Sequence, residues 1–261
     1  GIKVDYPQGI QAKEFILPKE LLEQNCVISL SKMKTHALER ITGAVKNSYG
    51  FVYGFHKAKG HTQYPSADSF ARMLIDLNKC VAPKLYVMDG IVAMEGNGPG
   101  SGDPVQMNVM LMSTDPVALD SVFSRLVYLK PEMVPTNYHG EKMGLGTWKE
   151  EEITLLTPDG EISMSEAVKR YGNPQFNVDR TEVRKNIWTR MAGALNIFQK
   201  KPYIEADKCV RCGICVQSCP VPGKAVDFRK GKGKPPVYDY KKCIRCFCCQ
   251  EMCPKKAIKV K

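Results

Sequence analysis

CVRCGICVQSCP (Cys209–Pro220) and CIRCFCCQEMCP (Cys243–Pro254) are two copies of one cysteine pattern in the 261-residue chain. Each copy has the spacing Cys-x2-Cys-x2-Cys-x3-Cys-Pro, and a shift of 34 residues superimposes all four cysteines and the proline. Nine of the 11 cysteines lie in this region, which leaves only Cys26 and Cys80 in the first 200 residues. The tail of the chain is therefore a duplicated unit organised around its cysteines.

The repeated spacing is typical of chains that bind two 4Fe–4S clusters as cofactors. Three thiolates on a tight loop ligate three irons of one cluster, and the fourth, next to proline, reaches the neighbouring cluster. This rule predicts two sets of ligands, each drawn from both copies. The sets are Cys209, Cys212, Cys215 and Cys253 for the first cluster, and Cys243, Cys246, Cys249 and Cys219 for the second.

Zinc and disulfides explain the pattern less well. Structural zinc sites use pairs of ligands around one ion, and disulfides would need no repeat. Residues 203–261 also resemble bacterial-type 4Fe–4S ferredoxins through these two motifs. The resemblance implies a small α+β ferredoxin-like domain that transfers single electrons.

Cys248 is an extra cysteine in the second copy, at the position where the first copy has Ile214. Two interpretations are open: a buried thiol that replaces an aliphatic side chain, or a spare ligand that exchanges with Cys249. The first is favoured because the equivalent position is apolar.

The net charge of +11 is concentrated in the tail. Residues 201–261 contain 15 Lys and Arg against 5 Asp and Glu, whereas residues 1–200 contain 23 against 22. A basic surface attracts acidic molecules, so we expect a redox protein partner with an acidic surface. The segment Arg229–Pro236 is either a solvated loop or a docking element for that partner. Nucleic acid is disfavoured because the lysines surround a cysteine framework with few aromatic residues.

The sequence also bears on location. No stretch approaches the roughly 20 consecutive apolar residues of a membrane-spanning helix, and no secretory signal opens the sequence. We therefore expect no membrane span and a cytoplasmic protein of an anaerobic or microaerobic redox pathway. The chain begins with Gly1 rather than methionine, so the sequence leaves open whether a segment precedes it.

The first 172 residues have the pattern of an α/β sheet domain. Ser66 and the pair Asp115-Pro116 predict the starts of two helices, because both are N-cap signatures. A mixed helical stretch is expected over Glu39–Ser48. Apolar runs predict strands at Cys26–Leu30, Lys84–Met88, Met107–Met112 and Ile153–Thr157.

Strands that alternate with helices favour an α/β domain over residues 1–172. A helical linker is expected over residues 173–202, with its helix at Asp179–Phe198. The ferredoxin-like domain follows at residues 203–261.

Five polar residues from two short motifs form a candidate ligand site. They lie near the end of the first predicted strand, where α/β folds commonly bind ligands. Several cations at one strand end would suit a phosphate or a carboxylate, so we expect an anionic small molecule there. The alternative is a solvated loop with a structural histidine. The five residues are Lys32, Lys34, His36, Lys46 and Asn47.

Two acidic residues, Asp89 and Glu95, form a second candidate beside the glycine-rich loop Glu95–Pro104. Carboxylates at strand ends would bind a hard cation or orient a substrate. The alternative is a turn that simply needs glycine. Because no Ser-His-Asp order, P-loop or dinucleotide fingerprint accompanies these residues, the sequence names no reaction.

Four motifs, in order, resemble the domain of unknown function 362 family. They are Lys32–His36, Thr42–Asn47, Asp89–Pro99 and Thr114–Asp120. The resemblance covers about residues 1–160 and implies a genuine family site at the candidate residues above, without supplying a reaction. Members often carry a C-terminal ferredoxin module, as here, and commonly begin with a further strand and loop that this chain lacks.

These observations predict an iron–sulfur electron-transfer protein. Its two clusters would relay electrons to or from an α/β domain that binds an anionic substrate, as a component of an oxidoreductase. Two alternatives remain open: a non-catalytic electron carrier or adaptor, and a redox-responsive sensor that docks an acidic protein partner.

Overall fold

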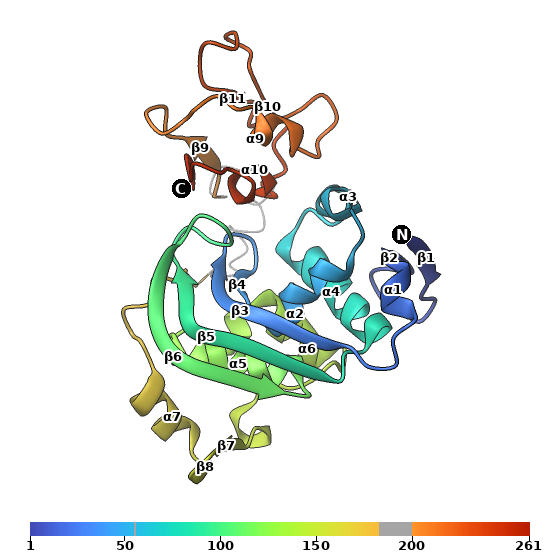
Figure 1. Cartoon of the computed structure of the whole chain (residues 1–261), viewed down its shortest axis with the longest axis vertical. Coiled ribbons are helices and arrows are strands. Elements are labelled where there is room, and N and C mark those ends of the chain that lie inside the picture. Colours follow the sequence, from blue (N-terminus) through green and yellow to red (C-terminus); the bar gives the residue numbers. More distant parts are fainter. Residues whose placement is uncertain (55, 183–199) are drawn as a thin grey trace, which may run out of the picture.

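The computed structural model describes residues 1–54, 56–182 and 200–261 (Figure 1). Its first part is built on a four-stranded mixed sheet, which confirms the predicted α/β class with a sheet core. β3 runs parallel to β5, and the other neighbours are antiparallel. In spatial order the strands are β4 (Arg40–Thr42), β3 (Ile28–His36), β5 (Leu85–Glu95) and β6 (Asp103–Ser113).

β3 is longer than predicted, because it continues through the polar run Ser31–His36. Along this run Ser31, Met33 and Thr35 are buried, whereas Lys32 is exposed. A period of two is the pattern of a strand with one covered face. Three of the candidate residues expected after the strand, Lys32, Lys34 and His36, therefore lie in its second half.

Two other segments differ from their predicted form. Instead of a helix over Glu39–Ser48, the chain forms β4 and the one-turn helix α2 (Ala44–Asn47). The segment predicted as a strand at Ile153–Thr157 forms β7 (Leu155–Thr157), which makes a separate two-stranded sheet with β8 (Gly160–Ile162). Such short elements are decided by tertiary packing, which local patterns do not contain.

Helices cover one face of the main sheet (Figure 1). As predicted, α4 (Ala67–Val81) begins at the N-cap Ser66, and α5 (Pro116–Leu126) begins at the N-cap Asp115. The other helices are α1 (Lys19–Leu22), α3 (His56–Gln63), α6 (Pro135–Lys142) and α7 (Met164–Tyr171), and an N-terminal hairpin consists of β1 (Ile2–Asp5) and β2 (Glu14–Leu17).

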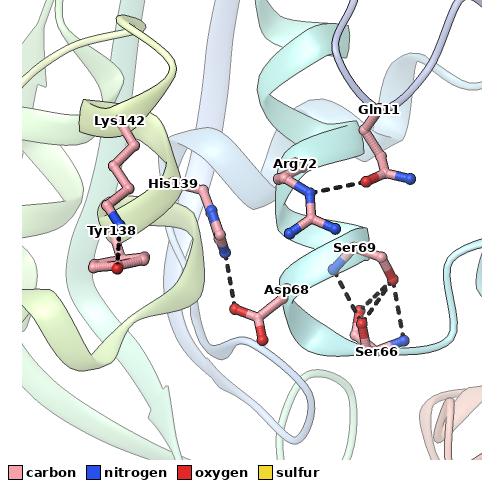
Figure 2. Close-up of polar contacts among 8 residues, drawn as sticks. All are labelled: Gln11, Ser66, Asp68, Ser69, Arg72, Tyr138, His139 and Lys142. Carbon is pink, nitrogen blue, oxygen red and sulfur yellow. Dashed lines mark hydrogen bonds and ion pairs between the residues drawn. The ribbon is translucent and has the colours of Figure 1, made fainter.

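Polar contacts hold α4 against its neighbours (Figure 2). His139 Nε2 on α6 lies 2.8 Å from a carboxylate oxygen of Asp68 on α4. One turn further along α4, Arg72 donates a hydrogen bond to the Gln11 side chain at 2.8 Å. These contacts fix the position of α4, which in turn packs against α2.

The opposite face of the main sheet carries exposed apolar side chains. Leu30 is 72% exposed, Met112 63% and Met110 55%. Lys32 and Asp89 form an ion pair between neighbouring strands on this face. Among the described residues, the helix-covered face is therefore the one that contains the core.

The tail repeats its motif in structure as well as in sequence. Each copy has a one-turn helix, α9 (Ile214–Gln217) in the first and α10 (Cys248–Glu251) in the second. Both helices follow a residue with left-handed backbone, Gly213 at φ 79° and Phe247 at φ 60°. Two short antiparallel pairs complete the tail: β9 (Pro202–Ile204) with β12 (Ile258–Val260), and β10 (Val226–Asp227) with β11 (Val237–Tyr238).

The linker helix predicted at Asp179–Phe198 lies mostly outside the described residues, which omit 183–199. Its first four residues, Asp179–Glu182, are described and are not helical. Within the described ranges, every helix is too short or too polar to span a bilayer.

Candidate functional site

Two cavities in the tail are each lined by four cysteines, and each set draws from both copies of the motif. Apolar side chains complete the walls, for example Ile258 in the first cavity and Val226 in the second. The first cavity is lined by Cys209, Cys212, Cys215 and Cys253, and the second by Cys219, Cys243, Cys246 and Cys249.

The donor sets fit 4Fe–4S clusters better than single metal ions. Each set consists of thiols, the ligands that these clusters require. Within the part of the chain that the structure describes, no three His, Cys, Asp or Glu side chains are placed to hold one ion, as structural zinc would need. Four thiols around a cavity suit a cubane instead, because each thiolate then binds a different iron.

The electrostatics of the cavities agree with this fit. Burial, together with the charges of neighbouring cysteines, raises the pKa of the Cys215 thiol to about 11 and that of Cys249 to about 12. Thiols in this setting ionise together only with positive charge between them, which cluster irons provide. The Tyr238 hydroxyl lies 3.0 Å from Cys249 Sγ and offers that sulfur a hydrogen bond.

Cys248 is buried, with 8% of its surface exposed, in agreement with its apolar counterpart in the first copy. Its thiol is hydrogen-bonded to that of Cys246. The described lining of the second cavity includes Cys249 but not Cys248. The spare-ligand interpretation stays a prediction.

Helix α10 carries Cys249 of the second cavity and lies on the side of the tail that faces the α/β domain (Figure 1). Gln250 on α10 is fully buried, and its side-chain amide donates to the carbonyl oxygens of Asn97 at 2.8 Å and Gly98 at 2.9 Å. Asn97 in turn donates from its side chain to the Ile258 carbonyl at 3.0 Å. The glycine-rich loop that the sequence singles out is therefore a docking surface for the tail.

This loop also lies directly against the end of β3. A Cβ atom at Gly98 would stand 2.1 Å from the Thr35 carbonyl oxygen, so only glycine permits the approach. The Thr35 hydroxyl donates to the Gly96 carbonyl at 3.1 Å. Contacts within a few residues thus connect α10, the loop and β3.

Four ionisable side chains are buried close to this junction, and we call them the buried polar set. They come from four different elements: the end of β3, the turn after it, α2 and α3. The set consists of His36 (5% exposed), Glu39 (0%), Lys46 (8%) and His61 (5%).

Sequence reasoning found His36 and Lys46 but missed Glu39 and His61. Glu39 lies between two of the quoted motifs. A single carboxylate between two lysine-containing motifs is the sequence signal that could have indicated its place in the site. His61 lies on α3, in a segment whose histidines had no evident role. Its ring stacks on Phe70 with centroids 4.5 Å apart, which fixes its orientation.

Burial shifts the pKa of every member of the set toward its neutral form. It lowers the pKa of His36 well below 6.5, with the Lys46 charge adding to the effect, and lowers that of His61 to about 3. Burial also raises the pKa of Glu39 well above 4.5 and lowers that of Lys46. Burial therefore favours the uncharged imidazoles of His36 and His61 and the acid form of Glu39.

The tautomer of His36 follows from its hydrogen bonds. Its Nδ1 accepts the backbone N–H groups of Leu38 and Glu39, both at 3.1 Å. A neutral imidazole that accepts at Nδ1 carries its proton on Nε2. This Nε2–H is buried and has no hydrogen-bond partner among the described residues.

Asp120 on α5 holds α2, and thereby Lys46, in position. Its two carboxylate oxygens accept the backbone N–H groups of Ala44 at 2.5 Å and Val45 at 3.1 Å. A Cβ atom at Gly43 would stand 1.9 Å from the Asp120 carboxylate, so glycine is needed there. Burial raises the pKa of Asp120 to about 7. Two of the family motifs therefore meet in one capping contact.

The remaining sequence-predicted candidates lie elsewhere or have structural contacts. Lys32 and Asp89 pair with each other on the open sheet face. Asn47 donates from its side chain to the Leu30 carbonyl at 3.0 Å. Glu95 accepts the backbone N–H of residue 177 at 2.7 Å.

Lys34 is half-buried and belongs near the buried polar set. Its charge lowers the pKa values of both His36 and Lys46. Lys34 therefore adds to the positive potential around these two residues.

The tail stands close to the buried polar set. The charge of Glu251 on α10 raises the pKa of Lys46, and Cys248 acts in the same direction. A cleft of about 410 Å³ also opens between the tail and the α/β domain, with His36 and Arg40 on one wall and Lys259 on the other. His36 thus borders both the cleft and the buried polar set.

Comparison with known proteins places these features in families. Residues 2–125 match the domain of unknown function DUF362, and residues 201–254 match the 4Fe-4S dicluster domain. A thylakoid-associated protein of Synechocystis sp. is 41% identical over 130 residues, which are 49% of this chain and 40% of that protein. The chain thus matches less than half of this relative's length, and no solved structure matches it. The chain therefore contains a region that matches DUF362, followed by a region that matches the 4Fe-4S dicluster domain, and this is the order that its motifs predict.

Proposed function

We propose that this protein relays single electrons through two 4Fe–4S clusters, one in each four-cysteine cavity. The observation that carries the proposal is the crossed lining of the two cavities, which gathers four thiols from both motif copies around each. Bound clusters supply one-electron redox chemistry, and the ferredoxin-like tail holds them at a fixed separation.

The second cluster is the one that exchanges electrons with the α/β domain. Its ligands Cys246 and Cys249 flank or belong to α10, which docks on the glycine-rich loop through Gln250. Charges on α10 also act on Lys46, so this end of the tail and the buried polar set are electrostatic neighbours. The α/β domain then binds an anionic small molecule at that set.

The first cluster faces the external partner. Cys212 is exposed, whereas Cys219 and Cys249 around the second cavity are buried. Arg211 and Lys255 line the first cavity. A basic rim around a more accessible cluster favours a redox partner with an acidic surface.

For location we propose the cytoplasm. The relative's name records an association with thylakoids, and that property belongs to the relative. Separation of soluble from membrane fractions, followed by immunodetection of this chain, tests the proposal. Recovery mainly with membranes would contradict it.

The test of the clusters uses two variants, each of which removes one cysteine from a different cavity. Anaerobically reconstituted protein should contain about eight irons per chain and show visible absorption that dithionite bleaches. Cys219→Ser removes a ligand from the second cavity, and Cys253→Ser removes one from the first. Each variant should retain about four irons, with electron paramagnetic resonance signals of different clusters lost in the two cases.

Cys248→Ser serves as the matched control, because this buried cysteine is outside the described lining of the second cavity. It should keep about eight irons. Protein with zinc alone, or with about two irons, would refute the cluster assignment. Identical spectra for Cys219→Ser and Cys253→Ser would refute the crossed ligation.

A further inference from the structure

The buried polar set contains hydrogen-bonding atoms that have no partner among the described residues. They are His36 Nε2, both carboxyl oxygens of Glu39 and Nδ1 of His61. All belong to side chains that are at most 5% exposed. Since buried polar atoms in folded proteins are almost always hydrogen-bonded, such a concentration indicates a ligand site.

Lys46 adds a positive charge to the same place. The Lys46 residue is buried, with 8% of its surface exposed, and it is not among the lysines that form ion pairs with described residues. The charge of Glu251 acts on it, and its Nζ lies 5.5 Å from the centroid of the Tyr49 ring. A buried cation that forms no direct ion pair is costly, so the site favours a compensating negative charge in contact with Lys46.

The donors of the set match a small carboxylate. His36 presents Nε2–H, because its Nδ1 is occupied by two backbone N–H groups. Lys46 presents its ammonium group, and Glu39 in its acid form presents an O–H. Three donors from three elements would satisfy the two oxygens of a carboxylate, which accept up to four hydrogen bonds.

The His61 ring forms a wall of this site rather than a further charge. It stacks on Phe70 and lies edge-on to Tyr49, with ring centroids 5.5 Å apart in the second case. This aromatic wall excludes water and strengthens the hydrogen bonds inside. His36 also lines the cleft of about 410 Å³ between the tail and the α/β domain.

We propose that His36, Glu39 and Lys46 form a buried binding site for the carboxylate group of a small organic acid. The inference rests on the proposed function, in which the α/β domain binds an anion next to the second cluster. It adds the chemical class of that anion and assigns a role to Glu39.

The proposal requires affinity to depend on pH. An ionised Glu39 would repel the ligand, so binding should weaken as pH rises and Glu39 loses its proton. The other charged or titratable groups that interact electrostatically with members of the buried polar set come from β3, α3, α4 and α10. They are Lys34 and His36 on β3, His61 on α3, Asp68 on α4, and Cys248 and Glu251 on α10.

The test is isothermal titration calorimetry of the cluster-loaded protein with sodium acetate, between pH 6 and pH 9. Wild-type protein should bind one acetate per chain, with affinity that falls as pH rises. Lys46→Met should weaken binding at least tenfold at pH 6. Glu39→Gln should retain binding at pH 6 and lose most of the pH dependence, because the amide still donates a hydrogen bond and does not ionise.

Lys32→Met is the matched control, since Lys32 is an exposed lysine already paired with Asp89 on the open sheet face. It should bind acetate like the wild type. If Lys46→Met does not fold, His36→Gln is used instead. This variant should weaken acetate binding, because the glutamine side chain does not present an N–H group at the position of the His36 Nε2–H. Absence of saturable acetate binding, unchanged affinity in the folded Lys46 or His36 variant, or wild-type pH dependence in Glu39→Gln would overturn the proposal.

Iron content measured on the same samples separates the two proposals. A protein with about eight irons that does not bind acetate refutes only the carboxylate site. A protein that binds acetate but lacks iron refutes the electron relay and leaves the site standing.

Discussion

Replacing Asp120 by alanine should destabilise the α/β domain through the start of α2. The carboxylate is fully buried and accepts the N–H groups of Ala44 and Val45 at 2.5 and 3.1 Å. Its removal leaves two buried donors without acceptors, each at a cost of about 1–3 kcal/mol. The expected loss is therefore about 2–6 kcal/mol, or a decrease in Tm of roughly 5–20 °C for a chain of this size.

Two measurements on cluster-loaded protein at pH 6 examine this expectation. Circular dichroism at a fixed heating rate gives the shift in Tm, and hydrogen exchange with mass spectrometry reports on residues 42–48. Asp159→Ala, in an exposed turn, is the control and should shift Tm by less than about 2 °C. If Asp120→Ala behaved like this control, and exchange at Ala44 and Val45 stayed slow, the capping contact would not be what positions Lys46.

Two further predictions concern pH and the contact between the domains. Burial raises the pKa of Asp120 from 3.8 to about 7, so between these values the folded state keeps a proton that the unfolded chain releases. The free energy of unfolding should therefore fall by up to roughly 4 kcal/mol as pH rises from 4 to 7. Chemical denaturation should show a smaller fall for Asp120→Asn, and equal falls in the two proteins would exclude Asp120 as the cause. Gln250→Ala removes two hydrogen bonds between α10 and the glycine-rich loop, which should cost about 2 kcal/mol in total. Hydrogen exchange at residues 96–102 should become several-fold faster in this variant, whereas the control Gln217→Ala on α9 should leave it unchanged. Equal exchange rates in the two variants would contradict the contact.

Local patterns predicted the long and well-capped elements of the fold. Ser66 and Asp115 predict the starts of α4 and α5, because one N-cap side chain accepts hydrogen bonds from free N–H groups at a helix start. The polar half of β3 was read as a loop because three of its residues are charged or can be charged, Lys32, Lys34 and His36. The alternation of Lys32 and Lys34 with Ser31, Met33 and Thr35 is the sequence signal that indicates a strand.

The candidate site was only partly accessible from sequence. Cysteine spacing is set by the geometry of a bound cluster, so the eight cysteines are readable without a structure. The buried polar set depends instead on tertiary proximity. Glu39 is a carboxylate that burial makes unusual, and nothing in its sequence neighbourhood reports that burial. Lys32 illustrates the opposite error. Its motif suggested that it belongs to the same site as Lys34, but the structure pairs it with Asp89 on the exposed face of the sheet.

The mixed origin of each four-cysteine lining has a consequence for biosynthesis. A nascent chain that has emerged only as far as Cys219 presents three thiols of one lining and a single thiol of the other. On the proposed ligation, neither cluster would have all four of its cysteine ligands until the second motif has left the ribosome. Maturation of the tail should accordingly be a late, all-or-none event, and a translation product that stops before Cys243 should emerge without either centre complete.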